Sequence, residues 1–208
     1  FIRGKRKKKD VQEFMLRLGD EIAELHADLV SGRYTHDFYA HFRINDPKPR
    51  DIHKASVRDR LLHHAIHRKL YPFFARTFIA DSFSCQTGKG LHRAIERFRA
   101  VARKVSRNGT RTCWILKCDI RKFFASIDHK ILIGILERRI ADRLLIGLLG
   151  NIIGSFHSVP GRGIPLGNLT SQLFANVYMN ELDQFVKHEL RMRYYIRYAD
   201  DFVFLSQS

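Results

Sequence analysis

The feature that most constrains this 208-residue chain is an apolar and aromatic stretch, residues 194–205, interrupted by the adjacent carboxylates Asp200 and Asp201. The runs on either side are typical of two short strands, and the polar break is typical of a tight turn. We therefore expect both carboxylates at the tip of a buried hairpin. Burying two like charges is costly unless a cation offsets them, and oxygen ligands suit Mg²⁺ or Mn²⁺. A solvated Asp-Asp turn is the simpler alternative.

The charge balance restricts the class of partner. Lys and Arg outnumber Asp and Glu by 37 to 21, a net charge of +16, which favours nucleic acid over an anionic membrane surface. Hydrophobic residues make up 45% of the chain, enough for a folded core. No apolar run reaches membrane-spanning length, and no apolar region follows the basic N-terminus. We expect no membrane partner, a cytoplasmic location and three reduced, partly buried cysteines.

A second carboxylate ends a β-rich run. Residues 111–119 are typical of a buried strand that finishes at Asp119. Strand-end carboxylates from distant segments can meet around two metal ions, the arrangement used in two-metal phosphoryl transfer. The backbone carbonyl of Ile120 could add a ligand. The alternative for Asp119 is an ordinary turn residue, and Asp128 is expected to cap the helix that follows.

The other segments are predicted by apolar spacing and by helix end signals. Asp10 is the expected N-cap of the first helix, and Ser31-Gly32 its end. The glycine-punctuated loop 84–90 lacks the spacing of a phosphate-binding P-loop. The expected helices cover residues 10–30, 58–74, 91–104, 130–155 (one or two helices, broken near 140–142) and 170–190.

Two loops offer places for a phosphate or a substrate. Pro47 and Pro49 stiffen a turn that presents Lys48 and Arg50, and such cations suit a triphosphate or a phosphodiester backbone. An ordinary basic loop is the alternative. Residues 160–172 combine three glycines with two prolines, so the backbone is tightly constrained just before a helix N-terminus. A plain connector is the alternative there.

Four of these segments, in this order, resemble the motifs of reverse transcriptases. The resemblance spans roughly residues 45–205, and its last part is similar to the Tyr-x-Asp-Asp hairpin of that family. Four ordered motifs are more specific than any one alone. They are Pro47-Lys48-Pro49-Arg50-Asp51-Ile52 with Asp59-Arg60, Asp119-Ile120-Arg121-Lys122-Phe123-Phe124, Gly163-Ile164-Pro165-Leu166-Gly167-Asn168-Leu169-Thr170-Ser171-Gln172, and Tyr198-Ala199-Asp200-Asp201.

The resemblance implies an α+β fold, the fingers and palm of a right-hand polymerase, with an antiparallel palm sheet packed on helices. Residues 1–105 would form an N-terminal helical segment and the fingers, and residues 106–208 the palm. A thumb would be absent from this chain and follow Ser208, so we expect the chain to be part of a longer protein.

The resemblance also implies a role for each matching residue. Asp119, Asp200 and Asp201 would be catalytic and would hold Mg²⁺ or Mn²⁺ together with the Ile120 carbonyl. Phe124 would exclude ribonucleotides as a steric gate, while Phe123 packs in the core. The remaining assignments are nucleotide contacts by Lys48, Arg50, Leu166, Gly167 and Gln172, and primer or template contacts by Tyr198, Arg60 and Lys89. The implied partners are an RNA template, a DNA or RNA primer and dNTPs.

One departure narrows the type of reverse transcriptase. Most relatives have Gln-Gly-x-x-x-Ser-Pro in the pocket motif, whereas this chain has Leu166, Gly167 and then Ser171-Gln172. That pattern, and the loop 85–90, are similar to diversity-generating retroelement enzymes, which copy RNA with errors at adenines and work with a small basic accessory protein. We expect Leu166 to loosen base selection. Group II intron, defence or CRISPR-associated reverse transcriptases are alternatives, as is a catalytically idle RNA-binding palm module.

Overall fold

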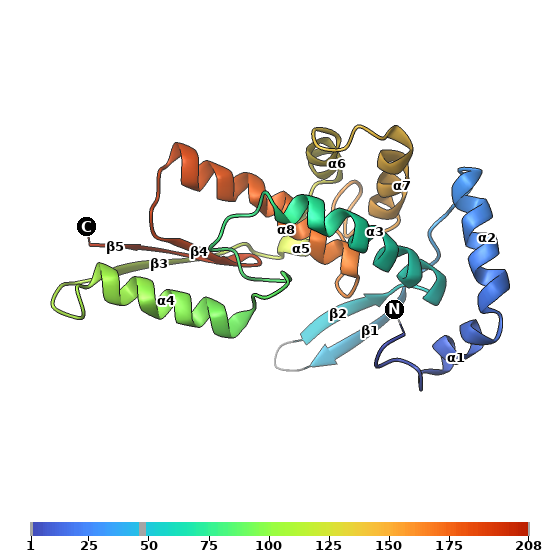
Figure 1. Cartoon of the computed structure of the whole chain (residues 1–208), viewed down its shortest axis with the longest axis horizontal. Helices are drawn as coiled ribbons and strands as arrows, with labels where there is room; N and C mark the ends of the chain where they lie inside the picture. Colours follow the sequence, from blue (N-terminus) through green and yellow to red (C-terminus); the bar gives the residue numbers. More distant parts are fainter. Residues whose placement is uncertain (1, 46–48, 208) are drawn as a thin grey trace. The chain divides into compact units, whose positions relative to one another are not determined.

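The computed structural model describes residues 2–45 and 49–207 (Figure 1), and the chain divides into two compact units. Unit 1 comprises Phe1–Leu70 and Phe124–Ser171, and unit 2 comprises Tyr71–Phe123 and Gln172–Ser208. The sequence predicted one domain boundary, between residues 105 and 106. In the structure, each unit instead consists of two stretches that lie far apart in the sequence. The division into fingers and palm stays a prediction. Lys48 lies outside the described residues.

Unit 1 contains an antiparallel two-stranded hairpin and several helices. The strands pair from Ala40 opposite Lys54 to Asn45 opposite Pro49. Of the predicted proline-stiffened turn, Pro49 and Arg50 are the first residues of β2, and residues 46–48 lie outside the described residues. The elements with residues in this unit are α1 (Lys9–Leu16), α2 (Leu18–Val30), β1 (Ala40–Asn45), β2 (Pro49–Lys54), the first part of α3 (Val57–Ala75), most of α5 (Phe123–Ser126), α6 (His129–Glu137), α7 (Arg143–Gly154) and the start of α8 (Leu169–Gln184).

The first predicted helix is two helices, and its predicted cap was wrong. The backbone leaves the helical region at Arg17, where φ is −115° and ψ is 24°. Helix α1 already begins at Lys9. Asp10 instead accepts from Arg60 at 2.6 Å and pairs with Lys54 at 2.6 Å. Two cationic partners hold this carboxylate more strongly than backbone amides would. The predicted end is confirmed, because α2 stops at Val30 and Gly32 has a φ of +68°.

Two aspartates cap the helices of the 130–155 region. The Asp128 carboxylate accepts from the backbone N–H groups of Lys130 and Ile131, so the predicted cap of α6 is confirmed. Asp142 accepts in the same way from Leu144 and Leu145 and begins α7. Each cap satisfies N–H groups that have no partner within the helix. The predicted break near 140–142 is therefore confirmed.

Unit 2 is built on a three-stranded antiparallel sheet in the order β3-β5-β4. Alternate residues of β4 point to opposite faces of the sheet. Ile196 joins the core with α4, whereas Arg197 contacts Asp183 of α8. The two helices therefore cover opposite faces (Figure 1). The elements with residues in this unit are the end of α3, α4 (Leu91–Val105), β3 (Trp114–Asp119), α5 (Phe123–Ser126), α8 (Leu169–Gln184), the π-helix η1 (Phe185–Glu189), β4 (Tyr195–Tyr198) and β5 (Asp201–Ser206).

The predicted burial of the Asp119 strand was wrong. Strand β3 pairs only with β5 among the described strands, so it is an edge strand. Trp114 and Leu116 are 63% and 61% exposed. A sequence rich in β-branched and aromatic residues predicts a strand, but it does not tell an edge from a centre, because that depends on which strands pair. The predicted α+β class with an antiparallel sheet packed on helices is confirmed.

Two general expectations can be compared with the described residues. None of their helices combines the length and apolar character that a membrane span needs. The three cysteines are free, as predicted, although Cys85 is exposed rather than partly buried.

Candidate active site

The two adjacent carboxylates lie at the end of the β4–β5 hairpin. Tyr198 and Asp201 are paired, so Ala199 and Asp200 form a two-residue turn. Ala199 has a φ of +56°, in the left-handed region that favours glycine. The tip is not buried as predicted, because the Asp201 side chain is 50% exposed. Partial exposure lowers the cost of two neighbouring charges and leaves room for a ligand.

The third predicted carboxylate lies beside this hairpin. Asp119 is the register partner of Asp201 across the β3–β5 ladder. Paired residues in an antiparallel ladder have Cα atoms about 4.5–5.5 Å apart and point their side chains to the same face. Sheet pairing therefore brings together two carboxylates that are 82 positions apart in the sequence (201 − 119).

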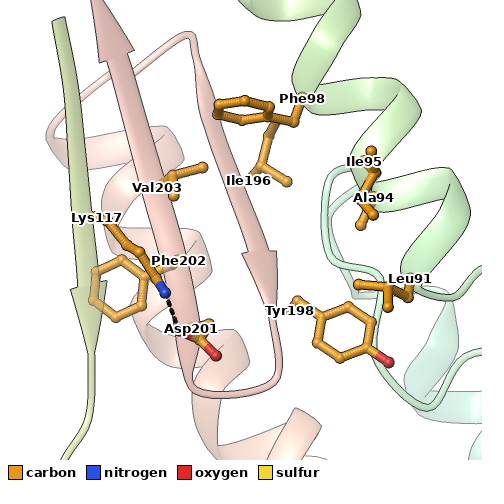
Figure 2. A pocket seen from close by; sticks show the side chains of 10 residues that line it. All are labelled: Leu91, Ala94, Ile95, Phe98, Lys117, Ile196, Tyr198, Asp201, Phe202 and Val203. Carbon is orange, nitrogen blue, oxygen red and sulfur yellow. Dashed lines mark ion pairs between the residues drawn. The ribbon is translucent and has the colours of Figure 1, made fainter.

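A lysine lies next to this carboxylate pair. The Nζ atom of Lys117 is 3.4 Å from the Asp201 carboxylate, as Figure 2 shows. The described residues contain no group of three or more His, Cys, Asp or Glu side chains arranged to hold a metal ion. The expected convergence of all three carboxylates is thus only partly met. The pair itself supplies hard oxygen donors of the kind that Mg²⁺ and Mn²⁺ prefer, and so fits a divalent cation.

A cavity of about 430 Å³ lies between the sheet and α4. Its walls are mainly apolar, from Ile95 and Phe98 on α4 and from Ile196 and Val203 on the hairpin (Figure 2). Tyr198, the predicted primer contact, also lines it and is 36% exposed. The apolar walls pack the carboxylate hairpin against α4 on this face.

Unit 1 holds residues 163–171 of the predicted nucleotide-pocket segment, and backbone hydrogen bonds fix this part in place. Ile164 donates to the carbonyl of Phe124 at 2.9 Å, and His53 of β2 donates to the carbonyl of Leu166 at 3.1 Å. The segment is thereby tied to the predicted steric gate and to the β1–β2 hairpin. Phe123 is buried, as predicted, whereas Phe124 is only half-buried.

Gly167 is required by the backbone of this segment. Its φ is +113°, and a Cβ atom there would lie 3.2 Å from Cγ2 of Ile52. We expect Gly167→Ala to lower the free energy of unfolding by about 1–3 kcal/mol, because it adds both backbone strain and a close contact. Chemical denaturation measures this change.

Gly147 is the matched control, because it lies inside α7 with open space around its Cα. Gly147→Ala is expected to raise stability by about 1 kcal/mol through helix propensity alone. Equal effects of the two substitutions would contradict the assignment for Gly167.

A buried polar network surrounds the end of the pocket segment. The ring of His63 hydrogen-bonds to the Thr170 hydroxyl at 2.6 Å and to the ring of His36 at 3.1 Å. Burial, with the neighbouring His36, lowers the pKa of His63 to about 4. The Nδ2 atom of Asn168 is buried and has no hydrogen-bond partner among the described residues. The first turn of α8 is thus held by a hydrogen bond to His63, whose lowered pKa keeps its ring neutral near pH 7.

Two further residues predicted to contact primer or template, Lys89 and Arg60, bind partners within the protein. The Lys89 ammonium donates to the carbonyls of Ile79, Ala80 and Ser82 at 3.3, 2.9 and 2.6 Å. Those three bonds use all its protons, which favours a structural role over a primer or template contact. Arg60 is 14% exposed and donates to Asp10. Its predicted contact with primer or template stays a prediction.

The remaining predicted contacts lie in different units. Arg50 is exposed on β2 in unit 1, and Gln172 is half-buried on α8 in unit 2. The half-buried Ile120 directly follows β3. The nucleotide contacts of Arg50 and Gln172, and the metal contact of the Ile120 carbonyl, stay predictions.

Sequence reasoning missed one buried ion pair. Arg197 and Asp183 are both fully buried, and their groups approach to 2.6 Å. The available signal was an arginine within the apolar run before the carboxylates. Charged residues are almost never fully buried unless they are paired.

The chain matches the family model described as "Reverse transcriptase (RNA-dependent DNA polymerase)" over residues 45–208. Among curated proteins, it is 29% identical to Protein YkfC of Escherichia coli over 83% of this chain and 47% of that protein. It is 27% identical to the group II intron-encoded protein LtrA of Lactococcus lactis over 72% of this chain and 25% of that protein. The chain thus spans less than half the length of these relatives.

Solved structures with a similar fold include a chain of a partial Cas6-RT-Cas1–Cas2 complex. It has a TM-score of 0.52 at 20% identity, over 91% of this chain and 33% of that one. Telomerase from Candida albicans gives a TM-score of 0.58 at 12% identity, over 85% of this chain and 39% of that one. At these low identities, the two structures show a similarity of fold alone.

Proposed function

Because the chain belongs to the reverse transcriptase family, we propose that its protein is an RNA-directed DNA polymerase that adds dNTPs to a primer 3′-hydroxyl on an RNA template. The observation that carries the proposal is the register pairing of Asp119 with Asp201 beside Asp200. A polymerase needs carboxylates at one point of its sheet for phosphoryl transfer. The net charge of +16 suits a nucleic acid duplex.

Different residues of the chain would bind the cations and the primer in this reaction. Asp119, Asp200 and Asp201 would provide oxygen ligands for Mg²⁺ or Mn²⁺, with the carbonyl of Ile120. When bound, the cations lower the pKa of the primer hydroxyl and stabilise charge on the leaving pyrophosphate. Tyr198 would support the primer end.

In the same proposal, the residues of the matching motifs would contact the incoming nucleotide. Arg50 would meet the triphosphate of a dNTP with Lys48, and Gly167 and Gln172 would line the nucleotide's site. Phe124 would exclude a ribose 2′-hydroxyl by contact with its ring.

A primer-extension assay on poly(rA)/oligo(dT) with Mg²⁺ tests the proposal. It should be run on the longest encoded form of the protein, because the relatives are longer than this chain. We expect extension that disappears in Asp200→Ala, while duplex binding remains. Binding without extension by the unmodified protein would overturn the proposal and favour an RNA-binding module.

The type of reverse transcriptase is a finer proposal. The Leu166-Gly167 pattern favours a diversity-generating enzyme, which would use a small basic accessory protein. The likeness to the group II intron-encoded protein LtrA favours an intron-type enzyme as the second candidate. The half-buried Leu166 has no polar side-chain group to offer a nucleotide.

Base selection distinguishes the two types. We expect Leu166→Gln to lower misincorporation at template adenines by about fivefold, because one added hydrogen bond contributes about 1 kcal/mol. Sequencing of the cDNA measures this rate. Leu144→Gln is the control, since Leu144 is 87% exposed on α7. An unchanged error rate at template adenines in Leu166→Gln would contradict the proposal that the protein is a diversity-generating enzyme.

A further inference from the structure

The guanidinium of Arg197 lies beneath the carboxylate hairpin, on the sheet face that α8 covers. Its Nε and Nη2 atoms donate to the two carboxylate oxygens of Asp183 at 2.8 and 2.6 Å. Tyr195 donates to the same carboxylate at 2.8 Å. The pair is fully buried and bidentate, which fixes the plane of the guanidinium.

The remaining terminal nitrogen reaches the turn that carries the carboxylates. Nη1 donates to the carbonyl of Ala199 at 2.9 Å and to Oδ1 of Asn176 at 3.3 Å. Ala199 is the turn residue with the left-handed φ of +56°. An alanine holds that conformation only where its surroundings impose it. Arg197 thus connects α8 directly to the strained turn before Asp200.

The main chain of Arg197 is held as firmly as its side chain. Its N–H donates to the carbonyl of Asp81 at 2.9 Å, and its carbonyl accepts from Phe83 at 3.0 Å. The strand cannot shift along α8 without breaking these bonds as well. The guanidinium is therefore a fixed support rather than a mobile side chain.

A buried ion pair is a poor way to stabilise a fold, because apolar residues of similar volume often serve as well. A hydrogen bond to one carbonyl of a turn does something that apolar residues cannot, since it selects one orientation of that peptide. The direction of the next residue, Asp200, depends on that peptide.

We propose that Arg197 is a positioning residue for the carboxylates, holding the Ala199 carbonyl so that Asp200 and Asp201 keep one orientation toward Asp119. This inference rests on the proposed polymerase function. Asp183 and Asn176 orient the guanidinium from α8. Arg197 itself touches neither primer nor nucleotide.

The test replaces the buried polar group by apolar residues in the triple variant Arg197→Met, Asp183→Leu, Tyr195→Phe. This variant leaves no unpaired charge at the site. The control is Tyr195→Phe alone, which removes one bond to Asp183 and leaves the Arg197–Ala199 contact. Thermal unfolding, hydrogen exchange of residues 198–202, Mg²⁺ dependence and primer-extension kinetics are measured for both variants.

We expect the triple variant to unfold within a few degrees of the unmodified protein. Amides 198–202 should exchange at least about tenfold faster, the half-saturating Mg²⁺ concentration should rise several-fold, and kcat should fall at least about tenfold. The KM for dNTP should stay within about twofold, and the control should match the unmodified protein. If the triple variant does not fold, Arg197→Lys is measured instead. Lysine retains the positive charge but lacks the planar guanidinium with its several N–H donors. This variant should therefore show the same changes.

Unchanged exchange and unchanged Mg²⁺ dependence in a folded variant would overturn the inference. A loss of kcat matched by an equal loss in the Tyr195→Phe control would overturn it as well. Failure of the unmodified protein to extend a primer would instead refute the proposed function. The two failures are therefore distinguishable.

Discussion

Asp119→Asn is expected to slow primer extension by about a thousandfold, because a neutral amide is a weaker ligand for a divalent cation than a carboxylate. The loss corresponds to several kcal/mol of transition-state stabilisation. Asp119 is exposed at the end of an edge strand, so the substitution should change the unfolding temperature little. Single-turnover extension at saturating dNTP measures the effect.

Asp142→Asn is the matched control for this substitution. Asp142 is an exposed carboxylate that caps α7, and asparagine caps helices about as well as aspartate. Extension by this variant should equal that of the unmodified protein. Similar rates for Asp119→Asn and Asp142→Asn would exclude Asp119 from the catalytic group.

Asp59→Ala is expected to lower the free energy of unfolding by about 3–5 kcal/mol. Asp59 is fully buried at the start of α3. Its carboxylate accepts from the Tyr34 hydroxyl at 2.7 Å, the Asp37 N–H at 3.1 Å and the Ser56 hydroxyl at 2.7 Å. Removing the acceptor leaves buried donors without partners, each at a cost of about 1–3 kcal/mol. Urea denaturation measures the change.

Asp51→Ala provides the comparison in the same unit. The Asp51 side chain is 58% exposed and pairs with His41 at the surface of the β1–β2 hairpin. Exposed pairs of this kind contribute about 0–1 kcal/mol. A loss of stability in Asp59→Ala no greater than in Asp51→Ala would show that the buried network does not hold unit 1 together.

The helices were predictable because their signals are local. Asp128 lies directly before α6, and its carboxylate contacts N–H groups two and three residues later. The glycine after α2 and the apolar spacing of α4 act over similarly short distances. The carboxylate hairpin was also predictable, because its two strands and its turn follow one another directly in the sequence. The break at Arg17 was missed, because the only nearby breaking signal is Gly19, and an isolated glycine within a helical pattern is tolerated.

The buried polar partners were not predictable from local signals. Tyr34 and Asp59 are 25 residues apart, and Arg197 and Asp183 are 14 apart. The apolar run around Arg197 was a signal that this charge would be buried, but nothing near either pair indicates which distant residue will be the partner. The same applies to the exposure of β3, because an edge position follows from the strand order and not from composition.

The resemblance to reverse transcriptases implied the α+β class, and residue order alone was enough to indicate the ends of several helices and the aspartates worth testing. These depend on interactions within a few residues, which a linear pattern records. Only the tertiary structure shows that Asp119 faces Asp201 and that Lys89 is held by the carbonyl of Ser82. The same is true of the hydrogen bond from Arg197 that supports the turn at Ala199. Those features arise from contacts between distant segments, whose free energy depends on burial and pairing after the chain has folded.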